Sequence, residues 1–211
     1  TCGTAWVVKL DSLYRIWIAP ELSVKRLERI TPAEWKRCIA NADAAGKSKK
    51  TLSNIRGAMT AFFDWCSENR ITVDKPEKIS VPKDAPVGER TILGTNDIKT
   101  LFSDDTILWR GKRRKAFYIH AWRLIVILGL RRGELAGIKH SDIDENGILH
   151  ICRSINSIGE VTSGKTKNAR RDILLPPHAL RVIEDQKAML KGLGIATRTW
   201  LFPGPDGNQM D

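Results

Sequence analysis

The stretch Leu124–Leu135, LIVILGLRRGEL, decides how the second half of the chain is expected to fold. Six of its first seven residues are apolar, which is typical of a helix buried in a core. Two adjacent arginines, Arg131 and Arg132, follow directly, and Gly133 and Glu134 come after them. A guanidinium group is costly to bury unless an anion meets it. The position of these arginines therefore raises the question of which anion they bind.

The composition favours a folded protein with a polyanionic partner. The 211 residues are 42% hydrophobic and 28% charged, which suits one large domain or two small ones. The formal net charge is +11, and the basic excess is spread over both halves of the chain. This distribution is typical of a protein whose inner face meets a polyanion, and a solvated basic surface is the alternative.

Cysteine usage and hydropathy argue against several other classes. The four cysteines stand far apart, with no CxxC pair and no metal-ligand spacing to the four histidines. We expect reduced thiols in a cytosolic protein. No apolar run reaches the roughly 18 residues of a membrane span, and we find no signal peptide. Because the chain begins at Thr1 and not at Met, we interpret it as a piece of a longer protein.

The first third of the chain predicts a helical domain over residues 1–72. Residues 4–19 have helical spacing and are expected to stop at Pro20. A second helix has both ends marked, with Thr31 as N-cap, Glu34 completing a capping box, and Gly46 closing it. A longer amphipathic helix starts near Ser48. Lys49 and Lys50 lie in its first turn, which suits a phosphate neighbour, although a solvated helix start is the commoner explanation.

The second half predicts a mainly helical domain with one small antiparallel sheet. Residues 73–91 carry prolines and charges without periodicity and are expected to form an extended linker. Residues 92–211 then form the second domain, centred on the apolar helix 115–130. Residues 147–156 and 170–176 have the composition of strands, and residues 177–194 that of a helix.

Two basic clusters are the candidates for chemistry. One is Arg131 with Arg132, and the other is GKTKNARR, residues 164–171, at a predicted hairpin turn. Neither suits a Ser/His/Asp site, and SGKTK lacks the upstream glycine of a phosphate-binding P-loop. Guanidinium and lysine groups suit a phosphodiester, and Glu134 lies three residues after Arg131, where it can orient that side chain. The alternatives are arginines stabilised at a helix C-terminus and a solvated hairpin tip.

These motifs resemble the tyrosine recombinases, also called the phage integrase family. LGLRRGELAGIKHSDID, residues 128–144, is similar to the family's first arginine box, and GKTKNARRDILLP, residues 164–176, to its β-hairpin with the catalytic lysine. Residues 30–71 resemble the helical, SAM-like core-binding domain, residues 81–102 its junction with the α+β catalytic domain, and residues 200–210 the segment before the second arginine box. The resemblance thus covers nearly the whole chain.

The resemblance implies a role for each matching residue. Arg131 matches the arginine that holds the scissile phosphate, and Glu134 the acidic residue that supports it. Lys165 matches the hairpin lysine that protonates the leaving 5′ oxygen, with Lys167 as the fallback if the register differs by two. Arg132 is not expected to be catalytic, and His140 is expected to pack. Further phosphate contacts are expected from basic residues in both domains, namely Lys49, Lys50, Lys83, Arg90, Arg153, Lys167, Arg170 and Arg171.

The family's remaining catalytic groups have no counterpart in the sequence. The His-x-x-Arg box should follow residues 200–210, and neither it nor the later His or Trp is present there. The nucleophilic tyrosine is also absent, since Tyr14 and Tyr118 both precede Arg131. We therefore expect the 211 residues to bind DNA without cleaving it. The full-length protein is expected to be a site-specific recombinase of a phage or other mobile element that integrates DNA through a 3′-phosphotyrosyl intermediate.

The resemblance also implies the surroundings of that enzyme. It implies no metal or other cofactor, double-stranded DNA with attachment sites as the partner, a homotetramer on DNA when full-length, and a cytoplasmic, nucleoid-associated location in bacteria. It implies no membrane contact. The competing hypotheses are a non-catalytic DNA-binding or architectural protein that reuses the fold, and a nuclease or topoisomerase.

Overall fold

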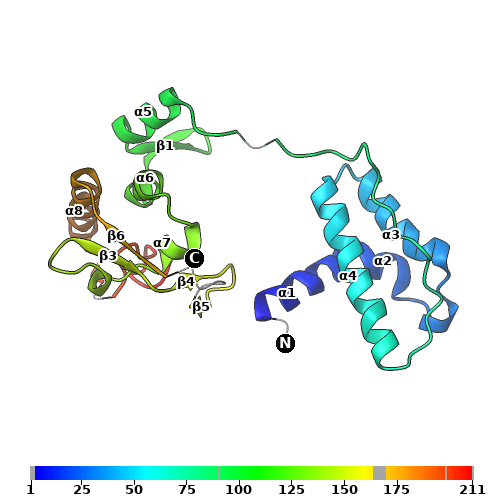
Figure 1. The fold of residues 1–211 in the computed structure, drawn as a ribbon. Coiled ribbons are helices and arrows are strands. Elements are labelled where there is room, and N and C mark those ends of the chain that lie inside the picture. Colours follow the sequence, from blue (N-terminus) through cyan, green and yellow to red (C-terminus); the bar gives the residue numbers. More distant parts are fainter. Residues whose placement is uncertain (1–2, 90, 164–169, 198, 211) are drawn as a thin grey trace. The chain divides into compact units, whose positions relative to one another are not determined.

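The chain divides into two compact units in the computed structural model, which describes residues 3–89, 91–163, 170–197 and 199–210 (Figure 1). The units comprise residues 1–91 and 92–211. The described part of the first unit folds into helices and connecting segments, and the second combines helices with antiparallel strand pairs. The predicted mainly helical fold with antiparallel strands is confirmed.

The first unit begins with a helix that does not stop where the sequence predicts. Helix α1, Thr4–Leu13, runs through a π-helical turn, Tyr14–Ile18, into α2, Ala19–Leu22. The wide turn is closed by the Ala19 N–H, which donates to the Tyr14 carbonyl. Proline is tolerated in the first turn of a helix because its missing N–H has no partner there. Pro20 therefore sits near the start of α2, and the expected stop at this residue is wrong.

The next two helices begin and end as predicted. After a 3₁₀ turn, Leu27–Arg29, helix α3 spans Pro32–Ala44 and α4 spans Lys49–Glu68. The Glu34 carboxylate accepts from the Thr31 N–H at 3.0 Å, as a capping box requires. Gly46 has a φ of +66°, and the Lys47 N–H returns to the Ala42 carbonyl. The Ser48 hydroxyl accepts from the Thr51 N–H at 3.4 Å and caps α4.

Residues 73–86 pack against the helices of the first unit. Val73, Ile79 and Val81 lie partly buried on the core, and Ala85 is 5% exposed. The Lys49 N–H donates to the Pro86 carbonyl at 2.8 Å. The part of residues 73–91 that lies before Val87 is thus held by side-chain burial and by a backbone hydrogen bond to the start of α4.

The described residues of the second unit form three helices longer than two turns and three pairs of strands. Its elements are α5, Thr95–Ser103; β1, Thr106–Trp109; β2, Lys112–Lys115; α6, Ile119–Leu128; α7, Arg132–Ala136; a 3₁₀ turn, His140–Asp142; β3, Ile148–Ile151; β4, Ser154–Ile155; β5, Val161–Thr162; β6, Arg171–Leu174; and α8, Pro177–Gly192. The antiparallel pairs are β1–β2, β3–β6 and β4–β5. Their described residues do not join into one sheet.

The core of the second unit gathers under α6, α8 and the β3–β6 pair. Leu124, Leu149, Ala179 and Leu201 are fully buried there. The β1–β2 hairpin was not predicted. Arg110 and Gly111, both with positive φ, form its two-residue turn, as hairpins of right-handed twist prefer. No helix among the described residues is long and apolar enough to cross a bilayer.

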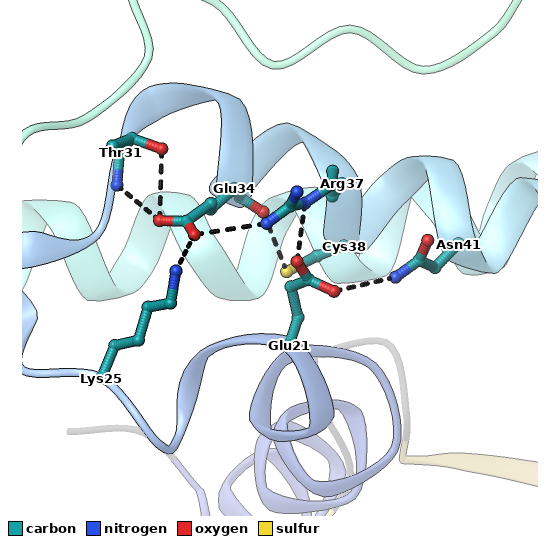
Figure 2. Close-up of polar contacts among 7 residues, drawn as sticks. All are labelled: Glu21, Lys25, Thr31, Glu34, Arg37, Cys38 and Asn41. Atoms are coloured by element: carbon teal, nitrogen blue, oxygen red, sulfur yellow. Dashed lines mark hydrogen bonds and ion pairs between the residues drawn. The ribbon is translucent and has the colours of Figure 1, made fainter.

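A polar network joins the start of α3 to the preceding segment in the first unit (Figure 2). Glu34, 7% exposed, forms ion pairs with Lys25 and Arg37. The Arg37 side chain also pairs with Glu21 on α2 at 2.6 Å, and Asn41 donates to the same carboxylate at 3.3 Å. The hydrogen bonds from Lys25 and the Thr31 N–H lower the pKa of Glu34 to about 2.

Glu34→Gln should destabilise the protein in a pH-dependent way. A carboxylate whose folded pKa lies below its unfolded value of about 4.3 stabilises the fold above that value, and this contribution is lost as the pH falls toward the folded pKa. We expect the variant to unfold at lower urea concentration at pH 7, and its difference from wild type to shrink between about pH 5 and pH 2. Glu77→Gln is the control, since this exposed residue has no described contact. A difference that stays constant over this range would contradict the assignment.

Candidate functional site

Arg131 lies between two short helices and is held on both sides by buried leucines. Helix α6 ends at Leu128, where Gly129 adopts a φ of +62° and donates its N–H to the Ile125 carbonyl. Leu130 and Leu135 are 5% and 2% exposed. Arg131 itself is the extended N-cap residue of α7, with φ −76° and ψ 148°. The alternative that the arginines sit at a helix C-terminus is therefore wrong.

Glu134 accepts four hydrogen bonds from two arginines. The Arg131 N–H donates to Oε2 at 3.0 Å, and Arg131 Nη1 donates to Oε1 at 2.9 Å. Arg171 Nη1 and Nη2 donate to Oε1 and Oε2 at 3.1 and 2.9 Å. The Glu134 side chain is only 4% exposed, whereas that of Arg131 is 75% exposed. The carboxylate thus holds Arg131 at one side-chain nitrogen and leaves most of its guanidinium accessible.

The electrostatics of this cluster favour an ionised carboxylate. Burial alone would raise the pKa of Glu134, but the hydrogen bonds from Arg171 and Arg131 outweigh it and hold this pKa at about 2. The same pairing raises the pKa of Arg171. Two cations face one anion, so the cluster keeps a net positive charge that attracts a further anion.

Gly133 allows α7 to pack directly on strand β4. A Cβ atom at Gly133 would lie 2.5 Å from the Ile155 carbonyl oxygen and 2.5 Å from Ser154 Oγ. Such contacts are far shorter than van der Waals distance, so any side chain here would move α7 away from β4. Because Arg131 lies two residues before Gly133 and Glu134 directly after it, the close approach fixes the position of both relative to the strands.

A second buried ion pair supports the other end of α7. Arg153 pairs with Asp142 and donates to the Gly137 carbonyl at 3.0 Å. The Arg153 side chain is 21% exposed. This arginine was predicted to contact DNA phosphate, and in the structure its guanidinium is engaged inside the unit. His140, predicted to pack, is half-buried, and burial and Lys187 lower its pKa.

The other predicted basic residues fall into two groups. Lys49, Lys50, Lys83 and Arg170 are exposed, and Lys49 Nζ donates to the Lys83 carbonyl at 3.1 Å. The predicted general acid Lys165, its fallback Lys167, and Arg90 lie outside the described residues. The structure therefore brings Arg131, Glu134 and Arg171 together, while Arg132 is exposed beside them.

Sequence reasoning missed the pairing of Arg171 with Glu134, which are 37 residues apart. One signal was present, because adjacent residues of a strand point to opposite faces. Arg170 and Arg171 both fall in residues 170–176, which have the composition of a strand, and this favours different environments for the two. In the structure Arg170 precedes β6 and is exposed, and Arg171 is 33% exposed at its side chain. Which of the two turns inward depends on the strand register, which the sequence does not fix.

The chemistry open to this cluster is the binding of an oxyanion. A guanidinium presents several N–H donors in a plane that matches two phosphate oxygens. Arg131 uses one of its nitrogens on Glu134 and directs the rest to solvent. Within the described ranges no group of three His, Cys, Asp or Glu side chains is placed to hold a metal ion.

Two relatives match most of the chain in sequence, although no family model does. The chain is 26% identical over 205 residues to a tyrosine recombinase XerC-like protein of Caldanaerobacter subterraneus subsp. tengcongensis, covering 87% of the chain and 50% of the relative. It is 26% identical over 202 residues to the integrase of Mycobacterium phage D29, covering 90% and 47%. The chain thus spans about half the length of these relatives.

Solved integrase structures share the fold. The Tn1549 transposon integrase in complex with transposon right end DNA has a TM-score of 0.73 and 18% identity, covering all of this chain and 69% of that chain. A lambda integrase tetramer bound to a Holliday junction has a TM-score of 0.64 and 16% identity, covering 100% and 55%. The fold is that of the integrases. Together with the sequence matches it confirms the predicted resemblance to the tyrosine recombinases.

Gly133→Ala should destabilise the second unit, whereas Gly57→Ala should not. The new methyl group at residue 133 meets the β4 backbone, and overpacking of this kind costs about 1–3 kcal/mol. Gly57 lies exposed in the middle of α4 with open space around its Cα, so alanine there should stabilise by roughly 0.5–1 kcal/mol. Urea unfolding followed by circular dichroism measures both changes. Equal midpoints for the two variants would show that α7 is free to move from β4.

Proposed function

We propose that the chain is the DNA-binding and arginine-bearing part of a site-specific recombinase that integrates a phage or another mobile element. The observation that carries this proposal is the Arg131 guanidinium, which Glu134 fixes at one nitrogen and which is otherwise exposed. The partner is double-stranded DNA with the element's attachment sites, in the bacterial cytoplasm at the nucleoid. The similarity to a tyrosine recombinase and to a phage integrase and the net charge of +11 support that partner.

Arg131 binds the scissile phosphate and stabilises the charge that gathers on its oxygens in the transition state. A preorganised donor aimed at such an oxygen is typically worth about 3–4 kcal/mol. Glu134 keeps the guanidinium oriented before the substrate arrives, so little reorganisation is needed at the moment of reaction. Lys165, or Lys167 in the alternative register, donates a proton to the leaving 5′ oxygen. In the full-length protein a tyrosine hydroxyl attacks the phosphorus and forms a 3′-phosphotyrosyl bond.

These 211 residues bind DNA without cutting it. Tyr14 and Tyr118 precede Arg131, and neither matches the family's nucleophile in position. His178 and Arg181 form a His-x-x-Arg sequence, but they lie before residues 200–210, whereas the family's box follows that segment. Strand cleavage therefore belongs to the longer protein, which we propose assembles as a tetramer on DNA.

Duplex affinity of the chain should fall steeply as salt is raised. Every phosphate that a lysine or arginine neutralises releases counterions and contributes about −0.9 to the slope of log K against log[salt]. Lys49, Lys50, Lys83 and Arg170 are the exposed candidates. The slope is measured by fluorescence anisotropy with a labelled duplex over roughly 50–300 mM salt. A duplex affinity that does not change with salt would contradict phosphate binding by the chain.

Arg131→Ala should abolish the covalent protein–DNA adduct in the longer, tyrosine-bearing protein. Duplex affinity should stay within about tenfold, since one phosphate contact among many is lost. Arg132→Ala is the matched control, because it removes the same charge from an exposed neighbouring side chain and should leave the adduct intact. Adducts are counted on denaturing gels with labelled attachment-site duplex. The assignment fails if Arg131→Ala weakens binding but the bound fraction still reacts normally.

A further inference from the structure

Arg171 engages Glu134 in a two-pronged pair that occupies both carboxylate oxygens. Its Nη1 and Nη2 atoms donate at 3.1 and 2.9 Å. Glu134 is 4% exposed and Arg171 33% exposed at the side chain, so the pair is largely shielded from water. Such fork-to-carboxylate pairs fix the orientation of both groups as well as their distance.

The ion pair connects strand β6 to helix α7. Arg171 is the first residue of β6 and lies six residues after Lys165 in the sequence. It stands opposite Ile151 in the β3–β6 register. Glu134 lies in α7, three residues after Arg131. The ion pair therefore ties the start of β6 to the helix that Arg131 caps.

Occupation of both oxygens also limits what Arg131 can do. Arg131 reaches only Oε1 with one side-chain nitrogen, and its guanidinium stays 75% exposed. A carboxylate without Arg171 would have free lone pairs on both oxygens, and a guanidinium fork binds such a group at two points. Arg131 would then turn its donors toward Glu134 and away from an incoming phosphate.

We propose that Arg171 is a positioning residue, which saturates Glu134 so that Arg131 is oriented but not captured, and that Arg171 itself does not contact DNA. This inference rests on the proposed function, because it assigns Arg131 to the scissile phosphate. It gives different roles to two adjacent arginines, Arg170 and Arg171, which were both predicted to contact DNA phosphate. Arg170, exposed and without a described hydrogen bond or ion pair, keeps that role.

The first test needs neither DNA nor activity. The Glu134 carboxyl is titrated by ¹³C NMR in the 211-residue chain, in wild type, Arg171→Lys and Arg170→Lys. Lysine keeps the charge but lacks the fork, so Arg171→Lys should raise the pKa of Glu134 toward its usual range. Arg170→Lys should leave that pKa at about 2. Identical titrations for the two variants would overturn the inference.

The second test uses adduct formation by the longer, tyrosine-bearing protein. Arg171→Lys should slow the single-turnover rate by about 100-fold, as displacement of a reacting group by about 1 Å does. The duplex concentration that half-saturates the rate should change little. The control is Arg181→Lys, at an exposed residue of α8 without a described hydrogen bond or ion pair, which should react like wild type. A direct phosphate contact predicts the opposite, since lysine would preserve it and Arg171→Lys would stay active. If wild type neither binds nor reacts, the proposed function fails, and the titration alone then decides the role of Arg171.

Discussion

The second unit depends on one buried carboxylate, Glu134. It joins the backbone of α7, the side chain of Arg131 and the first residue of β6 through four hydrogen bonds. A buried charge is tolerated only while its partners compensate it, and the loss of one partner is costly. The ionised state, the position of α7 and the direction of Arg131 are therefore set together. Gly133 completes this arrangement because it lets α7 lie directly on β4.

Local signals in the sequence were sufficient for most of the helical structure. Thr31 with Glu34, Gly46 and Ser48 marked helix ends that the structure confirms, since a cap depends on residues within one turn. The i,i+3 contact from Arg131 to Glu134 was predictable for the same reason. Contacts that depend on strand register and turns of unusual geometry were not predictable from local signals. The link from Arg171 to Glu134, the turn at Arg110 and the π turn before Pro20 all belong to that second group.

Each unit contains a helix whose start is fixed by a nearly buried glutamate. Glu34 and Glu134 each occupy the third position of a helix and accept the N–H of the residue that caps it. Each is nearly buried, and cations hold the pKa of each at about 2. The capping glutamate is thus a general means of fixing a helix start, and its presence does not by itself mark a functional site.

The balance of charge distinguishes the two clusters. Around Glu34, the cations Lys25 and Arg37 face two carboxylates, because Arg37 also pairs with Glu21. The two positive and two negative charges there cancel, so the cluster does not attract a further anion. Around Glu134, two arginines face one carboxylate, and no other described Asp or Glu lies within ion-pair distance of either. A fixed, exposed and uncompensated guanidinium is a group that a phosphate can bind without displacing another partner. Net charge, and not the capping motif, is what distinguishes the cluster at Arg131 as the candidate site.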